Sequence, residues 1–126
     1  MKMTIIEAIN RIDVLKPNSY PQSEKIKWLS TLDGIVKNEI IDTHAGGENV
    51  PFNGYDENTL LTTELLIPAP YDEVYLFWLE SKIDYYNAEM TKYNNSITMF
   101  NTAYSNYEKI YNRDNMPKAK KSRFLF

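Results

Sequence analysis

The sequence predicts a mainly α-helical protein, a small bundle of about four helices with a long, partly extended loop between the second and third helices. Two observations carry this prediction. Apolar residues recur every three or four positions along three stretches, which is the period of an amphipathic helix. Between residues 42 and 63 this period disappears and turn-forming residues replace it. A chain of 126 residues fits one domain, which we divide into a helical domain, 1–112, and a tail, 113–126.

Two helices are expected before the loop. The first begins at Thr4, because Thr4 and Glu7 have the spacing of a capping box, and it ends where Pro17 follows Lys16. The second begins near Pro21 or Ser23. Its internal Gly34 costs roughly 1 kcal/mol of helix propensity, which suggests close packing against another helix. The apolar face of this second helix comprises Ile26, Leu29, Leu32, Val36 and Ile40.

The segment from Asp42 to Thr63 is expected to project as a loop. It carries two clusters of turn-forming residues, and its Asn53-Gly54 pair is typical of a two-residue hairpin turn. Residues 50–52 and 65–67 are the plausible extended pieces, so a small two-stranded element is an option. A loop of about twenty residues within a compact domain usually has a function.

The stretch from Tyr71 to Tyr111 keeps its helical period without interruption. One continuous helix of this length would span roughly 60 Å at 1.5 Å per residue. A domain of this size has a diameter under about 40 Å. We therefore expect a hairpin of two helices, although the unbroken period favours one. The expected break is Asn94-Asn95-Ser96, where three poor helix formers adjoin.

Charge and cysteine content exclude several classes of function. The net charge is −3; residues 113–126 hold five basic residues and one acidic residue, net +4, which leaves −7 for the other 112. Such an acidic body argues against a domain that wraps nucleic acid. There is no cysteine, so disulfides, thiolate catalysis and cysteine-bound metals are excluded. No apolar run approaches the roughly twenty residues of a membrane span, and no signal-peptide pattern opens the chain, so we expect a soluble, intracellularly made protein.

No motif predicts catalysis, a cofactor or a metal. The single histidine, His44, has Asp42 and Glu48 near it in sequence, but this spacing matches no ligand motif, and a solvated loop histidine is the simpler interpretation. The chain lacks a nucleophile elbow. Gly46-Gly47 is not followed by the Lys-Ser/Thr of a phosphate-binding loop. We expect a protein that is not an enzyme.

Two groups of residues are candidates for contact with partners. Eight of the ten tyrosines lie between residues 71 and 111. At helical spacing such residues form either a core or an interface, where tyrosine is enriched. The tail combines basic residues with an apolar end, and it either is solvated or docks on a partner. The predicted interface residues are Tyr75, Tyr85, Tyr93, Tyr104, Lys118, Lys120, Lys121, Arg123, Phe124, Leu125 and Phe126.

A characteristic order of short segments runs along nearly the whole chain. The segments are Ile5-Glu7-Ala8-Ile9, Glu24 to Leu32, Pro68 to Tyr75, Trp78-Leu79-Glu80, Tyr93 to Ser96, Met99-Phe100-Asn101, Tyr111-Asn112-Arg113 and Met116-Pro117. In this order and pattern the chain resembles the small helical head–tail connector proteins of tailed bacteriophages and prophages, also called adaptor or head-completion proteins.

The resemblance implies a structural virion protein of the phage neck, made in the host cytoplasm. Such proteins form a homo-oligomeric ring, here expected to have twelve copies, beneath the portal protein. The ring joins the portal to the next neck or tail-completion protein, while DNA passes through its channel without specific binding. The resemblance also implies that the tail reaches toward the portal. The alternative from another class is a small regulatory protein that contacts nucleic acid or a partner protein through its basic tail.

Overall fold

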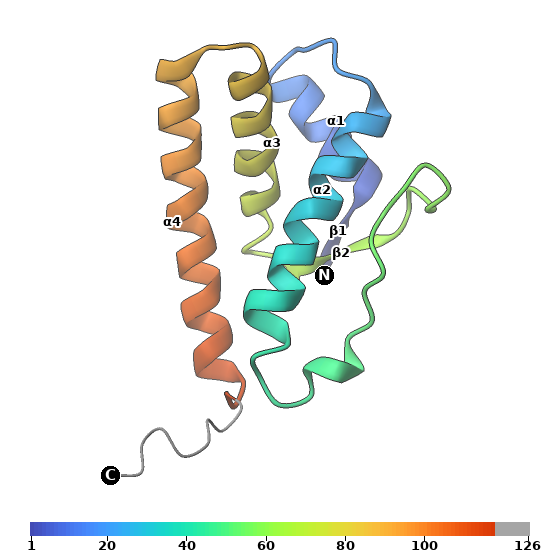
Figure 1. Ribbon diagram of the computed structural model, residues 1–126, viewed down its shortest axis with the longest axis vertical. Coiled ribbons are helices and arrows are strands. Elements are labelled where there is room, and N and C mark those ends of the chain that lie inside the picture. The colour runs from blue at the N-terminus through green and yellow to red at the C-terminus, as the bar shows by residue number, and fades with distance from the viewer. Residues whose placement is uncertain (118–126) are drawn as a thin grey trace.

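Four α-helices and a two-stranded antiparallel sheet make up residues 1–117, the part of the chain that the computed structural model describes (Figure 1). The mainly helical fold class is confirmed, and so is the long loop between the second and third helices. In chain order the elements are β1 (Lys2–Thr4), α1 (Ile5–Leu15), α2 (Gln22–Val36), a π-helical turn (Lys37–Ile41), a 3-10 turn (Gly47–Asn49), β2 (Glu64–Pro68), α3 (Glu73–Tyr86) and α4 (Met90–Asp114).

Helix α1 begins and ends as its sequence predicts. The backbone N–H of Thr4 donates to Glu7 Oε1 at 2.9 Å, and the N–H of Glu7 donates to Thr4 Oγ1 at 3.2 Å. This reciprocal pair satisfies two amides at the helix start. The last helical residue is Leu15, and Lys16 caps the helix in an extended conformation before Pro17. The buried side of α1 consists of Ile5, Ala8, Ile9 and Ile12.

Replacing Thr4 by alanine removes the side-chain half of this capping box. We expect the substitution to lower the free energy of unfolding by about 1 kcal/mol, the usual effect of losing an N-cap hydroxyl. Urea unfolding followed by circular dichroism measures the change. The control is Thr4→Ser, which keeps the hydroxyl and should stay close to the wild type. Equal losses in both variants would contradict the capping role.

The α3–α4 hairpin is confirmed, but the position predicted for its break is wrong. The chain turns at Asn87–Glu89, where Ala88 has a positive φ of 60°. Residues 94–96 instead lie inside α4, with Asn94 and Asn95 exposed. The hydroxyl of Ser96 is buried and donates to Asp84 Oδ2 at 3.0 Å. This tertiary contact and the packing of α4 on α3 outweigh the low helix propensity of the asparagines.

The sheet pairs the start of the chain with residues 64–68, which corrects the expected pairing. Residues 65–67 are extended as predicted, but they pair with β1, so that Lys2 faces Pro68 and Thr4 faces Glu64. Residues 50–52 form no strand, and although Gly54 adopts a positive φ of 87°, no hairpin forms there. Sequence analysis missed β1 because three residues before a helix carry too little periodicity to be recognised.

The loop after α2 lies partly against the bundle rather than projecting along its whole length. The Cβ of an alanine at position 34 would meet the ring of Phe52 at 3.8 Å, so Gly34 faces this loop and not the predicted helix. Tyr55 bonds to α2 through both its N–H and its hydroxyl. Leu60, by contrast, is 75% exposed. In Figure 1 the loop runs beside α2 and ends in an outward tip before β2.

The core lies between α1, α2, α3 and β2, and α4 closes one side of it. Most fully buried side chains come from these four elements, among them Leu29, Leu32, Ile67 and Leu79, and Ile40 of the π-helical turn joins them. Helix α4 packs along α3 (Figure 1), yet only three of its 25 residues are buried. These are Ser96, Phe100 and Tyr107. Most of the longest helix therefore remains at the surface.

Candidate interaction surfaces

The structure separates the four tyrosines that were predicted to meet partners. Tyr75 is fully buried, with 0% exposure, so its assignment to an interface is wrong. Its hydroxyl accepts the N–H of Ile67 at 2.7 Å and donates to Asp33 Oδ1 at 2.6 Å. A tyrosine at helical spacing can lie either in a core or at a surface. Tyr75 lies in the core because it is on the side of α3 that faces β2 and α2.

Asp33 is the centre of the buried polar cluster to which Tyr75 belongs. Its Oδ2 accepts hydrogen bonds from the hydroxyl of Tyr55 and from the N–H of Leu66. Burial raises the pKa of Asp33, and the three donated hydrogen bonds only partly offset this effect. Burial and the nearby carboxylate likewise raise the pKa of Tyr55 and Tyr75. One carboxylate thus joins α2, the loop, β2 and α3.

Tyr85 and Tyr93 belong to an aromatic cluster at the end of α3. Their ring centroids lie 5.4 Å apart, and Tyr85 also contacts Tyr86 at 5.2 Å. Tyr86 stacks on Trp28 of α2, with centroids 5.7 Å apart. Tyr85 and Tyr86 are about half exposed, at 51% and 54%. The predicted accessibility of Tyr85 is therefore present, and Tyr93 is half-buried beside it.

Tyr104 has contacts within its own chain. Its hydroxyl donates to Glu39 Oε1 at 3.0 Å, and its ring stacks on Phe100 with centroids 5.6 Å apart. Burial and the hydrogen bond to Glu39 raise the pKa of Tyr104. The residue is half-buried and joins α4 to the π-helical turn. Only part of its ring remains available to a partner.

His44 is a buried residue that attaches the end of α4, so the interpretation as a solvated loop histidine is wrong. Its ring is 2% exposed; Nε2 lies 2.7 Å from Asn112 Oδ1, and Nδ1 lies within hydrogen-bond distance of the Ile40 carbonyl. The nearby Asp42 pairs with Lys37 instead. Among residues 1–117, no three His, Asp or Glu side chains group as metal ligands would.

The tail residues named as interface candidates lie outside the described residues. These are Lys118, Lys120, Lys121, Arg123, Phe124, Leu125 and Phe126. The described chain ends beside His44, which forms an isolated β-bridge with Pro117, and the N–H of Ala45 donates to the Met116 carbonyl at 2.9 Å. The tail therefore starts from a fixed position at the far end of α4 from the α3–α4 turn.

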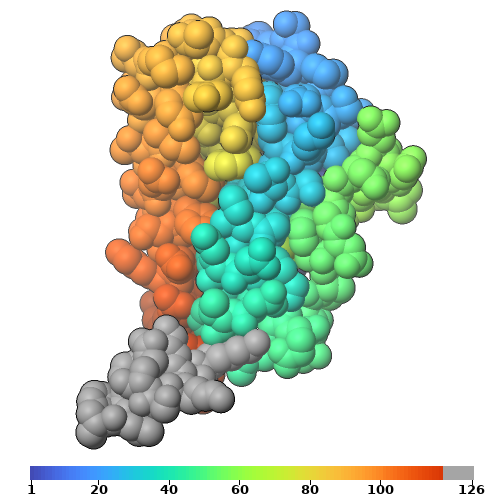
Figure 2. Space-filling model, viewed as in Figure 1, coloured from blue at the N-terminus to red at the C-terminus, as the bar shows by residue number. Residues whose placement is uncertain are grey.

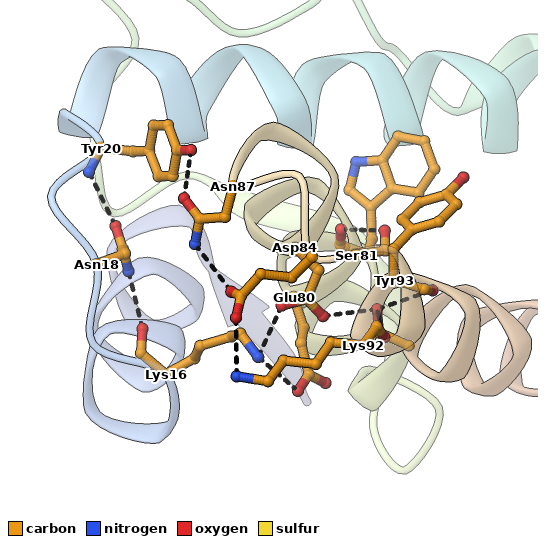
Figure 3. A network of polar contacts seen from close by, with 12 residues as sticks. Lys16, Asn18, Tyr20, Glu80, Ser81, Asp84, Asn87, Lys92 and Tyr93 are labelled. Atoms are coloured by element: carbon orange, nitrogen blue, oxygen red, sulfur yellow. Dashed lines mark hydrogen bonds and ion pairs between the residues drawn. The ribbon is translucent and has the colours of Figure 1, made fainter.

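A polar network closes the bundle at the α3–α4 turn (Figure 3). Lys16 Nζ lies 2.8 Å from Asp84 Oδ1 and 3.7 Å from Glu80 Oε2. Burial alone would lower the pKa of Lys16, but the hydrogen bond and charge of Asp84 outweigh it and raise the pKa. Ser96 donates to the other oxygen of Asp84. In this network opposite charges lie in contact, and their contacts join the end of α1 to α3 and α4.

The middle of helix α4 has an exposed side without charged residues, which we call the α4 face, and exposed Lys109 follows it toward the end of the helix. From Tyr93 to Tyr107 there is no charged residue. Charged residues usually make up about a quarter to a third of an exposed protein surface. The α4 face comprises Thr91, Asn94, Asn95, Thr98, Met99, Asn101, Thr102, Ser105 and Asn106, all exposed and all on the side opposite Phe100.

Two open hollows flank α1, and we call this surface the α1 face. The larger, about 480 Å³, is lined by Met1, Met3 and Val14 and by two basic and two acidic side chains: Lys2, Arg11, Glu7 and Asp72. The smaller, about 180 Å³, is lined by Leu15, Leu76 and Phe77 and again by two basic and two acidic side chains: Arg11, Lys16, Glu73 and Glu80. Each hollow therefore combines apolar side chains with balanced charge.

Comparison of the chain with protein-family models, curated proteins and solved structures finds no match. Among the described residues, no helix is both long and apolar enough to cross a membrane. The arrangement of the site therefore has to be interpreted from its own residues. The exposed residues form a neutral surface on α4 and an aromatic one at the end of α3. The buried polar residues Asp33, His44 and Asp84 join helices, strands and loop to one another.

Sequence reasoning missed Asp33, the α4 face and the α1 face. A signal for Asp33 exists, because it lies four residues after Leu29 and three before Val36, on the apolar side of α2. The absence of charge from 93 to 107 was also visible in the sequence. That this neutral segment is one exposed side of a helix required the fold.

Proposed function

We propose that the protein is a structural adaptor of the phage neck, which forms a ring under the portal and joins it to the tail. The observation that carries this proposal is the α4 face, because the longest helix of the domain leaves most of its surface uncovered and has no charged residue from 93 to 107. Charged residues are depleted in the centres of protein interfaces. The resemblance of the sequence to head–tail connector proteins supplies the kind of partner.

The distribution of charge also supports passage of DNA without binding. Between residues 38 and 81 there are nine acidic residues and no basic one. Phosphate binding needs lysine or arginine, so a surface of this composition repels a duplex. In sequence, this acidic segment includes the long loop, β2 and most of α3. In the proposed ring this part of each subunit faces the channel or the outside, and helices α1 and α4, whose basic and acidic residues nearly cancel, face neighbouring subunits.

The function is tested by mixing the purified chain with the portal protein of the same phage. We expect electron microscopy to show a ring of the chain bound at one end of the portal. The tail is tested by Phe124→Asp combined with Phe126→Asp, which should leave the circular dichroism spectrum unchanged and weaken portal binding. A chain that remains separate from the portal at every concentration would contradict the adaptor function.

The alternative, a regulatory protein that binds nucleic acid through its basic tail, follows from the four lysine and arginine residues between 118 and 126. It predicts DNA affinity that falls steeply with salt. Fluorescence anisotropy with a labelled duplex at low salt separates the two functions. A flat titration eliminates the alternative, whereas tight binding that is lost in a chain truncated after Pro117 supports it.

A further inference from the structure

An open hollow of about 300 Å³ lies beside the last turns of α4, and we call it the tyrosine hollow. Tyr71, Tyr107 and Tyr111 line it, and their rings form a row in which neighbouring centroids lie 5.9 Å apart. Its two charged lining residues, Lys2 and Asp114, have opposite signs. The tyrosine hollow is therefore an apolar and largely aromatic surface whose own charges cancel. The other apolar residues that line it are Ile41, Val50, Leu66, Pro68 and Ile110.

The chain leaves the described fold beside this hollow. Asp114 and Asn115, at the end of α4, line it. The next residue, Met116, is held in place because its carbonyl accepts the N–H of Ala45 at 2.9 Å. Figure 2 shows the end of α4 against the residues that follow α2, among which Ala45 lies. The segment 118–126 thus begins three residues after a residue that lines the hollow.

The length of this segment allows its end to return to the tyrosine hollow. The segment ends in the three apolar residues Phe124, Leu125 and Phe126. The seven residues from 118 to 124 span up to about 24 Å when extended, so Phe124 can reach the hollow from Pro117. A group attached by a link this short has an effective concentration of the order of millimolar. A weak intrinsic affinity is therefore enough to populate a contact within one chain.

The volume and the lining of the tyrosine hollow suit two phenyl rings. An apolar cavity of about 150 Å³ binds one benzene molecule, so a hollow of about 300 Å³ has room for two rings. Phe124 and Phe126 are two positions apart, and in an extended segment such side chains point to the same side. Aromatic rings prefer offset or edge-to-face contacts with one another. The row of tyrosine rings supplies such contacts.

Charge favours the same occupant. Residues 1–112 carry a net charge of −7, whereas the segment 118–126 contains four basic residues and no acidic one. Three of the acidic residues, Glu48, Glu64 and Asp72, lie within two positions of residues that line the hollow. Opposite charges attract each other within a Debye length, about 8 Å at physiological salt. The basic residues therefore draw the end of the chain toward the surface around the hollow.

We propose that in the isolated protein Phe124 and Phe126 occupy the tyrosine hollow of their own chain. This assignment does not depend on the adaptor function. If the tail docks on the portal, as proposed above, the portal has to compete with the hollow for the same two rings. The hollow then holds the end of the chain until the portal is present.

The first test uses introduced cysteines, because the chain has none of its own. Val50→Cys, at the hollow, combined with Leu125→Cys should form a disulfide within one chain on mild oxidation at low protein concentration. Mass spectrometry of the intact protein identifies the product. The matched control is Thr91→Cys with Leu125→Cys, which should stay reduced. Thr91 lies roughly 35 Å from the end of α4, beyond the reach of about 27 Å for residues 118–125.

The decisive comparison removes the two rings and keeps the length and charge of the segment. Phe124→Ser with Phe126→Ser, added to the Val50→Cys and Leu125→Cys pair, should slow formation of the disulfide about tenfold. Equal rates with and without the rings would overturn the proposal, because the link alone would then account for the contact. A disulfide-linked dimer as the main product would overturn it as well, since the hollow would then hold the end of another copy.

The second test leaves the hollow itself unchanged. The amide NMR signals of Leu66, Ile110 and Tyr111, which line the hollow, should shift between the wild type and the full-length Phe124→Ser, Phe126→Ser variant. The signal of Leu60, exposed on the loop, should stay in place, and the shifts should persist unchanged on tenfold dilution. Unshifted signals at the hollow would overturn the proposal and leave the adaptor function standing. A chain that stays separate from the portal would instead contradict the adaptor function and leave this contact standing.

Discussion

Replacing Asp33 by alanine is expected to lower the free energy of unfolding by about 3 kcal/mol, a large part of the 5–15 kcal/mol typical of a domain. The substitution leaves the Tyr55 hydroxyl, the Tyr75 hydroxyl and the Leu66 N–H without their acceptor. Each buried donor without a partner costs about 1–3 kcal/mol. Removal of a buried carboxylate returns part of this, because its own desolvation is unfavourable.

The matched control is Asp33→Asn, which keeps the shape and one acceptor oxygen. That oxygen can still receive Tyr55 and Leu66, so the expected loss is about half that of the alanine variant. Urea unfolding, followed by tryptophan fluorescence, compares the two. A loss below about 0.5 kcal/mol for Asp33→Ala would mean that Asp33 does not hold the loop, β2 and α3 together.

The pH dependence of Asp33 has a definite sign. Burial raises its pKa in the folded protein above the ordinary value of 3.8. The folded state therefore holds the proton more tightly than the unfolded state, which stabilises the fold as the pH falls. The stabilisation is complete below 3.8 and is lost as the pH rises through the raised pKa. The difference in unfolding free energy between wild type and Asp33→Asn should shift in favour of the wild type between pH 7 and pH 4, and a flat difference would contradict the raised pKa.

Replacing Leu79 by alanine is expected to cost about 2–5 kcal/mol, the range for deleting a fully buried leucine. Leu79 is 0% exposed and belongs to the core. Truncation removes apolar surface from the core and leaves a cavity that rigid neighbours fill only in part. Trp78, the residue before Leu79, is fixed by a 2.8 Å hydrogen bond from its indole N–H to the Trp28 carbonyl, so collapse around the cavity is restricted.

The same substitution at Leu60 serves as the internal control. Leu60 is 75% exposed on the loop, so Leu60→Ala should change the unfolding free energy by less than about 0.5 kcal/mol. Both variants lose the same atoms, and only burial differs. Thermal unfolding by calorimetry measures both. Comparable losses at the two positions would mean that the loop tip, and not α3 alone, contributes to the core.

Local signals in the sequence were sufficient for the parts of the fold that neighbouring residues decide. The capping box of Thr4 and Glu7, the end of α1 at Pro17 and the apolar period of α2 act within one or two helical turns. The length of the 71–111 stretch against the diameter of a small domain was enough to predict a hairpin. The lack of a periodic pattern after residue 42 was enough to predict the loop.

Only the tertiary structure decided the features that depend on residues far apart in the chain. By its own residues Asn94-Asn95-Ser96 predicts the end of a helix. In the structure Ser96 donates a hydrogen bond to Asp84, and α4 continues through residues 94–96. His44 reads as a loop residue, but Asn112 lies 2.7 Å from its ring. Tyr75 and Tyr85 have the same side chain on the same helix, yet one is buried and the other is half exposed. The physical reason is that the burial of a residue depends on which other elements pack against its side of the helix. The sequence of the helix itself does not specify those elements.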